Sequence, residues 1–447
     1  MRRRPVRTAT RRRSFISMKS KSSKFKPFRL LVAAAVLLTA AMPVAAAEEN
    51  VPDPYRIVAL GDSVSAGYEP IEAIENGTVA PYGYVDRIYE QSLFRNRTEL
   101  SSYGIMGLTT PGLLNLLQGA AEGKTLSASD LQDFSPFDPR VAVQADGVAK
   151  KTKQLASDLA RADLILLTIG GNDFSSLIKE ANAANGRSIE SARQIIQDGF
   201  QKTMNNYTED LEKMMTRLHE LAPGALIVTS DQYLPLFTGH PLYELLAKKV
   251  DELSAELDAF ADRMIGLGIP VKIAHVSGKF AGKSSEYTYF NLWDDFDIHP
   301  KQAGYEVIAR QFAETIWDDG YLKPAPRAEG VPMSVVIDGK EPPSKPVVKN
   351  NTTFLSIRDV ANATGADLEW IQSAKTAVFK KDGKEVAVAV GAKTIVVNGQ
   401  KKALATPAYF QQDGKQQKTY VPLAVISEGL DFQVVFRKPI MTAFIRS

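Results

Sequence analysis

The sequence of 447 residues has no cysteine, four histidines and three tryptophans. The absence of cysteine excludes disulfides, metal sites built from thiolates, and a lipid anchor on a cysteine after a leader segment. The shortage of histidine restricts the candidates for a catalytic base to His219, His240, His275 and His299. The apolar run at residues 30–41 is shorter than a membrane-spanning helix needs.

The N-terminal segment is basic and ends in small residues. Residues 1–47 hold eight arginines, four lysines and no acidic residue, followed within the segment by the apolar run and by Ala45-Ala46-Ala47. This order predicts a signal peptide at 1–47 with cleavage after Ala47. Met18 is an alternative initiator, and an uncleaved anchor is the alternative to cleavage. The Arg12-Arg13 pair lies well before the apolar run, which favours ordinary secretion over a twin-arginine route. We expect a secreted or cell-surface bacterial protein.

The formal charge of +3 is dominated by this leader. The rest of the chain has 42 basic and 51 acidic residues, net −9, which argues against nucleic acid as a partner. The charge is also uneven: residues 331–447 carry +6 and residues 48–330 carry −15. A basic C-terminal part next to an acidic part suggests contact with an anionic cell-wall polymer. A solvated spacer is the alternative.

Apolar runs and helical patterns alternate between residues 55 and 319. Five helix-linked strands predict an α/β fold, a flavodoxin-like three-layer sandwich with a parallel five-stranded sheet. The predicted strands are 56–60, 100–103, 163–169, 225–229 and 270–275, and the main predicted helices are 148–161, 189–221, 242–265 and 301–317. The long loops at 69–82 and 122–140 are expected to shape a substrate mouth. Tyr68, Tyr82, Tyr84 and Phe174 are candidates either for an acyl pocket or for ordinary packing.

A serine follows the first predicted strand in a tight turn. The sequence Gly61-Asp62-Ser63-Val64-Ser65 comes directly after the apolar run 57–60. The carboxyl ends of the strands in an open α/β sheet form the ligand crevice, so the Ser63 hydroxyl is expected there. The turn differs from the Gly-x-Ser-x-Gly elbow of α/β-hydrolases, because Ser65 replaces the second glycine.

A serine nucleophile needs a base and aimed hydrogen-bond donors. His299 precedes Pro300 and a predicted amphipathic helix, and Pro300 suits the first helical position. This junction favours His299 as the base over His219 on a helix surface, His275 in a strand, or His240. Donors are expected from Gly107 in a glycine-containing loop and from Asn172 in Gly170-Gly171-Asn172-Asp173. Either glycine cluster alone is compatible with an ordinary turn.

These four blocks resemble the SGNH/GDSL family of serine hydrolases, which includes lysophospholipase-like and esterase-like enzymes. Ser63, Gly107, Asn172 and His299 match the four positions for which the family is named. The resemblance implies that Ser63 is the nucleophile and His299 the general base and acid. It also implies an oxyanion hole made by the Ser63 and Gly107 N–H groups and the Asn172 side chain.

The chain departs from the family three positions before the histidine. An acidic residue is usual there, and this chain has Phe296. Asp297, Asp295 or the backbone carbonyl of Phe296 remains to orient His299, and we choose Asp297 as the third catalytic residue.

The region after a linker at 323–332 repeats itself. Val336-Ile337-Asp338-Gly339-Lys340 recurs at 396–400, and 353–357 recurs at 419–423, each followed by a short predicted helix and a strand. Asp338-Gly339 and Asn398-Gly399 predict hairpin turns. This β-rich tandem unit at 333–447 resembles the copper amine oxidase N-terminal-like domain. It contains no histidine or cysteine, so copper lacks its usual ligands and no metal is expected.

The sequence therefore predicts a secreted serine esterase or lipase-like hydrolase, with the catalytic domain at 48–322. Its substrate would be a small-molecule, lipid or polysaccharide acyl ester, cleaved without a cofactor through an acyl-enzyme on Ser63. The alternatives are an O-acetylesterase acting on cell-wall or other polysaccharide, and a surface-binding protein with a vestigial hydrolase domain.

Overall fold

The computed structural model describes residues 53–185, 188–290 and 297–447. The predicted signal peptide lies outside these residues, as do Asp295 and Phe296. The chain divides into one unit at Met1–Asn50 and a second at Val51–Ser447.

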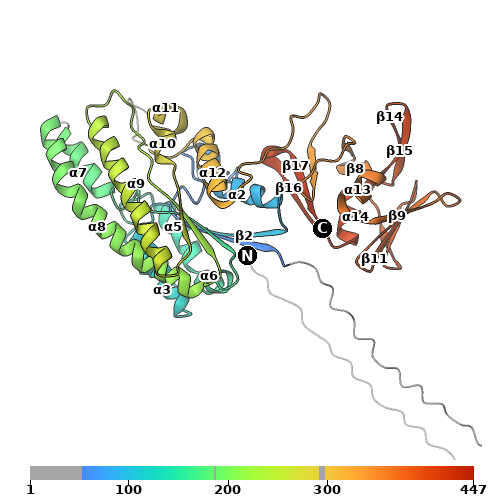
Figure 1. Ribbon diagram of the computed structural model, residues 1–447, viewed down its shortest axis with the longest axis horizontal. Coiled ribbons are helices and arrows are strands. Elements are labelled where there is room, and N and C mark those ends of the chain that lie inside the picture. Colours follow the sequence, from blue (N-terminus) through green and yellow to red (C-terminus); the bar gives the residue numbers. More distant parts are fainter. Residues whose placement is uncertain (1–52, 186–187, 291–296) are drawn as a thin grey trace, which may run out of the picture. The chain divides into compact units, whose positions relative to one another are not determined.

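The catalytic part is built on a five-stranded parallel sheet, as the sequence predicted. The strand order is β2-β1-β3-β4-β5, and every neighbouring pair is parallel. The strands are β1 Tyr55–Gly61, β2 Thr98–Gly104, β3 Leu164–Thr168, β4 Leu226–Ser230 and β5 Val271–Ala274. All five residues of the central strand β3 are buried, which explains its unbroken run of apolar residues. Figure 1 shows these strands with helices on both sides.

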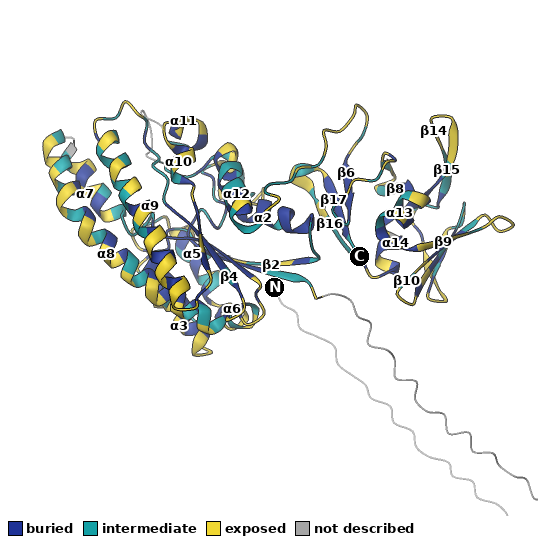
Figure 2. Cartoon of the chain, viewed as in Figure 1, coloured by how far each residue is buried: buried dark blue, intermediate teal, exposed yellow. Residues whose placement is uncertain are grey.

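Twelve helices accompany this sheet in the described residues. They are α1 Glu72–Glu75, α2 Tyr84–Leu93, α3 Thr110–Ala121, α4 Ala128–Leu131, α5 Pro139–Ala149, α6 Thr152–Leu159, α7 Ser175–Asn185, α8 Ile189–Leu221, α9 Tyr243–Gly266, α10 Ser277–Phe280, α11 Ser284–Tyr287 and α12 Gln302–Ile316. Figure 2 shows the strands buried and the outward faces of the long helices α8 and α9 exposed.

Alternate residues of β1 belong to two different cores, which defines the three layers. Val58 and Leu60 pack in the core that contains residues of α3, α5, α6, α8 and α9. Ile57 and Ala59 pack in the core that contains residues of α2, α10 and α12. Side chains along a strand point to opposite faces, so each face of the sheet has its own helical layer. The fold is therefore the predicted three-layer α/β sandwich.

Two local predictions are wrong. Residues 148–161 do not form one helix, because α5 ends at Ala149 and α6 begins at Thr152. The Thr152 hydroxyl donates a hydrogen bond to the Ala149 carbonyl, a local side-chain bond that competes with helix continuation. Pro300 does not occupy the first helical position; it forms a β-bridge with Thr288, and α12 begins two residues later.

The C-terminal region is β-rich, as predicted, and has three sheets in the described residues. Their orders are β13-β12-β11-β10-β9, β14-β15-β8-β7 and β16-β17-β6. The elements are β6 Ser334–Ile337, β7 Val347–Lys349, β8 Thr352–Ser356, α13 Ile357–Thr364, β9 Asp367–Ile371, β10 Thr376–Lys381, β11 Lys384–Ala389, β12 Thr394–Val397, β13 Gln400–Ala403, β14 Tyr409–Asp413, β15 Gln416–Pro422, α14 Leu423–Gly429, β16 Gln433–Arg437, the 3₁₀ turn η1 Lys438–Ile440 and β17 Thr442–Arg446.

The internal repeat appears as two strand–helix–strand units. The first is β8–α13–β9 and the second is β15–α14–β16, and β8 pairs with β15. Asn398-Gly399 joins β12 to β13 with both residues at positive φ, as a tight hairpin turn requires. Asp338-Gly339 has the same backbone conformation but is closed only by a single bridge between Ile337 and Lys340. The predicted turn at Asp338-Gly339 therefore forms, but in the described residues no strand begins directly after it.

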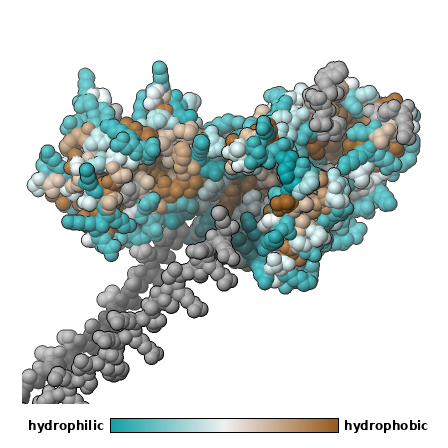
Figure 3. Space-filling model, turned by 180° about the vertical axis from the view of Figure 1, so that it is seen from behind, coloured by the Kyte–Doolittle hydropathy of each residue, from teal (hydrophilic) through white to brown (hydrophobic). Residues whose placement is uncertain are grey.

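Within the described part of the chain, no helix combines the length and the apolar character needed to cross a bilayer. In the rear view of Figure 3, apolar residues on the visible face form separate areas among hydrophilic ones.

Candidate active site

The nucleophile turn begins where β1 ends. Gly61 has φ +124°, and a Cβ there would lie 2.0 Å from the Thr168 carbonyl oxygen of neighbouring β3, so only glycine fits. The Asp62 N–H donates to that same carbonyl at 3.0 Å, and the Val64 N–H donates to the Asp62 carboxylate at 3.0 Å. These bonds hold Ser63 at the carboxyl end of the central strands with 8% of its surface exposed.

A buried polar group lies beneath the turn. The Thr168 hydroxyl donates to Asp62 Oδ1 at 3.1 Å and lies 2.7 Å from the Ser65 hydroxyl, which donates to the Leu60 carbonyl. Burial raises the pKa of the Asp62 carboxyl to about 6, although hydrogen bonds from Val64 and Thr168 and the nearby His299 oppose this shift. Asp62 is thus a structural carboxyl that fixes the position of Ser63.

Ser63, His299 and Asp297 form one hydrogen-bonded line. His299 Nε2 lies 2.8 Å from Ser63 Oγ, and His299 Nδ1 lies 2.8 Å from Asp297 Oδ1. Because the carboxylate accepts a hydrogen bond from the Nδ1–H, Nε2 is left free to accept the serine proton. Burial raises the pKa of Asp297, but the hydrogen bonds and charge of His299 outweigh it and leave that pKa below its usual value. The carboxylate is therefore ionised at neutral pH and stabilises an imidazolium.

The His299 segment is fixed by its neighbours. The His299 carbonyl accepts the Tyr289 N–H at 3.0 Å, and the Tyr233 hydroxyl donates to the Ile298 carbonyl at 2.9 Å. The Tyr68 ring contacts the imidazole edge-on, with ring centroids 4.7 Å apart. Asp297 also accepts the backbone N–H of His299 at 2.8 Å, so one oxygen orients both the main chain and the ring.

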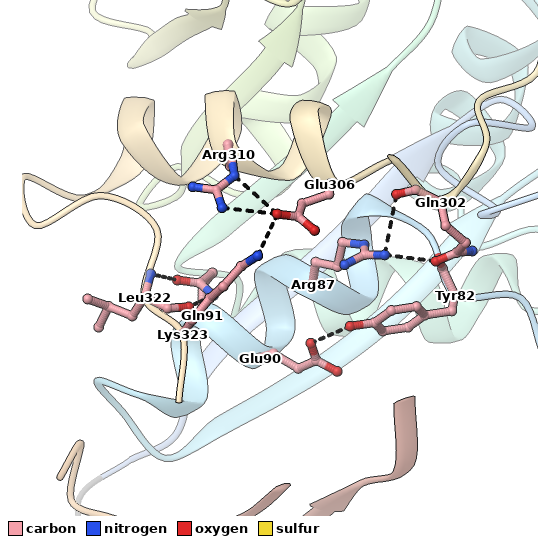
Figure 4. A network of polar contacts seen from close by, with 9 residues as sticks. All are labelled: Tyr82, Arg87, Glu90, Gln91, Gln302, Glu306, Arg310, Leu322 and Lys323. Carbon is pink, nitrogen blue, oxygen red and sulfur yellow. Dashed lines mark hydrogen bonds and ion pairs between the residues drawn. The ribbon is translucent and has the colours of Figure 1, made fainter. Parts of the chain in front are cut away.

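A polar network holds the start of α12, which follows His299 (Figure 4). Buried Arg87 donates to the Gln302 side chain at 2.8 Å, and Gln302 in turn donates to Glu69, which is 3% exposed. The Tyr289 hydroxyl donates to the other oxygen of Glu69 at 2.9 Å. Arg87 also lies 4.3 Å above the Tyr82 ring. Sequence reasoning missed Glu69 and Gln302, because buried pairs between distant segments have no local pattern.

The predicted oxyanion donors lie on two loops that are bonded to each other. Asn172 Nδ2 donates to the Leu108 carbonyl at 2.9 Å. The N–H and hydroxyl of Thr110 both donate to the Asp173 carboxylate at 3.1 Å. Burial raises the pKa of Asp173 to about 6, against those hydrogen bonds. The two glycine clusters therefore form one continuous rim rather than separate turns.

Gly107 requires its glycine. Its φ is +73°, and a Cβ there would meet the Phe137 ring at 2.8 Å. Gln132 donates to the Gly107 carbonyl at 2.9 Å and accepts the Thr109 N–H at 2.9 Å. The Gly107 carbonyl is thus held by Gln132, a residue the sequence did not single out.

Two of the other histidines, His275 and His240, have hydrogen-bond or ion-pair partners of their own, and Nδ1 of His219 is buried without one among the described residues. His275 follows β5 and lies between Asp231, 3.4 Å from Nδ1, and Asp258, 3.2 Å from Nε2. His240 accepts the Leu242 N–H near the start of α9, and His219 lies on α8. None of these hydrogen bonds involves Ser63.

Two of the four candidate aromatics pack inside the protein. Tyr84 is fully buried against Phe312, and Phe174 packs against Phe200 and Tyr207. Of the four candidates, Tyr68 is the one whose ring contacts the His299 ring within the described residues. In the described residues, no group of three histidine, aspartate or glutamate side chains is arranged to hold a metal ion.

Comparisons with known proteins identify two families along the chain. Residues 59–307, more than half of the chain, match the GDSL-like lipase/acylhydrolase family, and residues 336–440 match the copper amine oxidase N-terminal domain. The chain is 24% identical to the uncharacterized protein YpmR of Bacillus subtilis strain 168 over 174 residues, which are 39% of this chain and 61% of YpmR. The chain thus spans less than two thirds of that relative's length.

The solved structures that match this chain include two enzymes. A lipase, Lip_vut3, from a goat rumen metagenome is 17% identical, with a TM-score of 0.36 over 57% of this chain and 95% of its own. A family 3 carbohydrate esterase from Clostridium thermocellum is 15% identical, with a TM-score of 0.30 over 59% of this chain and 96% of its own. On the family match, this chain belongs to the GDSL-like lipase/acylhydrolase family of hydrolases.

Proposed function

We propose that the protein is a serine esterase that hydrolyses carboxylic acyl esters through an acyl-enzyme on Ser63. The observation that carries this proposal is the line from Ser63 Oγ to His299 Nε2 to Asp297, with 2.8 Å at each step. Both distances are within the range in which a proton moves along a hydrogen bond. A vestigial hydrolase domain would have no need to keep this geometry together with Gly107 and Asn172.

The reaction follows from these contacts. As Ser63 Oγ attacks the ester carbonyl carbon, its proton passes to His299 Nε2, and the carbonyl oxygen becomes an oxyanion. The Ser63 and Gly107 N–H groups and the Asn172 amide are the donors assigned to that oxygen. When the carbon–oxygen bond to the alcohol breaks, the imidazolium returns its proton to the leaving oxygen. A water molecule, deprotonated by His299, then attacks the acyl-enzyme and releases the carboxylic acid and the serine.

The test is hydrolysis of chromogenic acyl esters by the wild type and by Ser63→Ala. We expect the variant to lose about 10⁴–10⁶-fold in kcat with unchanged thermal stability. Ser157→Ala is the matched control, because Ser157 is exposed on α6 and makes no contact with the site. Turnover by Ser63→Ala equal to that of the wild type would refute the mechanism.

The same assay identifies which acyl groups the enzyme accepts. Esters from acetyl to long-chain, together with acetylated wall polysaccharide, separate a general esterase from a polysaccharide O-acetylesterase. Acetate released from the polysaccharide without turnover of longer esters would select the O-acetylesterase.

The proposal also covers the location of the enzyme and the partner of its C-terminal domain. The basic leader, its apolar run and its small terminal residues support export to the cell surface. The excess of six positive charges in residues 331–447 supports an anionic wall polymer as partner of the C-terminal domain. Cosedimentation of the full chain with cell walls should weaken as the salt concentration rises. It should be lost after the anionic polymers are extracted from the walls. Binding that is insensitive to both treatments would contradict this part.

A further inference from the structure

A groove of about 820 Å³ runs beside α5, in the region where the sequence predicted a substrate mouth. Its volume lies in the range of small-molecule sites. Its apolar wall is formed by Phe134, Phe137, Pro139, Ala142 and Val143. The charged residues in the lining are Asp133 and Asp146, both acidic, so the groove suits a neutral apolar ligand better than an anion.

Two residues of the groove lining lie against the oxyanion loop. The Phe137 ring that lines it is the one that lies against Gly107. Gln132 lines the groove as well, and its side chain bonds to Gly107 and Thr109. A ligand in the groove therefore lies next to the loop assigned to the ester carbonyl oxygen.

The first turn of α5 is also linked to His299 through a series of side-chain contacts. Arg140 lies 3.7 Å from the Glu75 carboxylate, Glu75 accepts the Tyr68 hydroxyl at 3.0 Å, and the Tyr68 ring lies on His299. The helix that forms one wall of the groove is thus connected to both halves of the catalytic site.

The direction of proton transfer indicates which part of an ester enters the groove. The leaving oxygen has to face His299 Nε2 to receive its proton, so the alcohol lies on the imidazole side. The acyl chain extends from the same carbonyl carbon in another direction, and the groove comes nearest to the oxyanion side at Phe137 and Gln132, the two lining residues that lie against Gly107. Val143, 74% exposed, is the most exposed of the large hydrophobic side chains in the described residues, and a chain in the groove would cover it.

We propose that this groove binds the acyl chain of the substrate and gives the enzyme a preference for medium or longer acyl esters over acetyl esters. This inference rests on the proposed esterase function. Each methylene buried in an apolar site contributes about a fourfold gain in kcat/KM. Wild-type kcat/KM should therefore rise from acetyl to octanoyl esters until the groove is filled.

The test is Val143→Asp, which places a charge in the groove wall at an exposed position. We expect kcat/KM for an octanoyl ester to fall at least about tenfold while the acetyl ester stays within twofold. Ile265→Asp is the matched control, because Ile265 is 56% exposed on α9 and does not line the groove. It should change neither substrate.

A binding measurement separates the two proposals. Calorimetry of the octanoyl ester with Ser63→Ala, with and without Val143→Asp, reports on the groove without turnover. Weaker binding in the double variant supports the groove, and equal binding overturns it. If the wild type hydrolyses acetyl and octanoyl esters equally and Val143→Asp changes nothing, the groove is wrong while the esterase stands. If the wild type turns over no ester but Val143→Asp weakens binding, the esterase fails while the groove stands.

Discussion

Replacing Asp297 by asparagine tests the part of the site that departs from the family pattern. Asparagine keeps an oxygen at the position of Oδ1, which accepts both the His299 backbone N–H and the ring Nδ1 at 2.8 Å. The substitution therefore removes the negative charge while it preserves an acceptor of the same shape.

The magnitude follows from the distance to the imidazolium that forms in the transition state. Opposite unit charges 2.8 Å apart attract by roughly 3–6 kcal/mol when the effective dielectric constant is about 20–40. This range applies because the two side chains are 20% and 23% exposed, so water screens them only in part. We expect kcat to fall by about 10²–10⁴-fold with little change in KM, since the lost attraction acts on the imidazolium that forms in the transition state.

The assay is steady-state hydrolysis of a chromogenic ester, with Asp258→Asn as the matched control. Asp258 also contacts a histidine, His275 Nε2 at 3.2 Å, but that pair does not contact Ser63. The control should keep wild-type kcat. A kcat for Asp297→Asn within threefold of the wild type would refute the reasoning and favour a Ser–His dyad. A larger loss in Asp295→Ala than in Asp297→Ala would move the role to Asp295.

Three further outcomes are expected. Asn172→Ala should lower kcat about 10²–10³-fold, and an unchanged kcat would remove it from the oxyanion hole. Gly107→Ala should lower kcat about 10–100-fold, because its Cβ would meet Phe137 at 2.8 Å at positive φ; full activity would show that the loop adjusts freely. Burial raises the pKa of Asp62 to about 6 from 3.8, so the native state binds that proton more tightly than the unfolded state. The wild type should therefore lose up to about 3 kcal/mol of unfolding free energy relative to Asp62→Asn as pH rises from about 4 to 6, and a constant difference would contradict this.

Strand and helix positions followed from local chemistry. The buried β3 is an unbroken apolar run, and α8 has the predicted bounds Ile189–Leu221. Periodicity failed between α5 and α6, where the Thr152 hydroxyl donates a hydrogen bond to the Ala149 carbonyl. The copper amine oxidase-like repeats were likewise visible, because each copy carries its own turn and short helix.

The sequence by itself determined which residues stand at the ends of the strands, because a parallel α/β sheet gathers those ends at one edge. It therefore named Ser63, Gly107 and Asn172 from the segments that follow predicted strands, and His299 from its place before a predicted helix. Only the tertiary structure brings Asp297 Oδ1 to 2.8 Å from His299 Nδ1, because that distance is set by folding, while Asp295 and Phe296 lie outside the described residues. The same is true of Gln132 and the groove beside α5, which exist only where segments distant in sequence pack together.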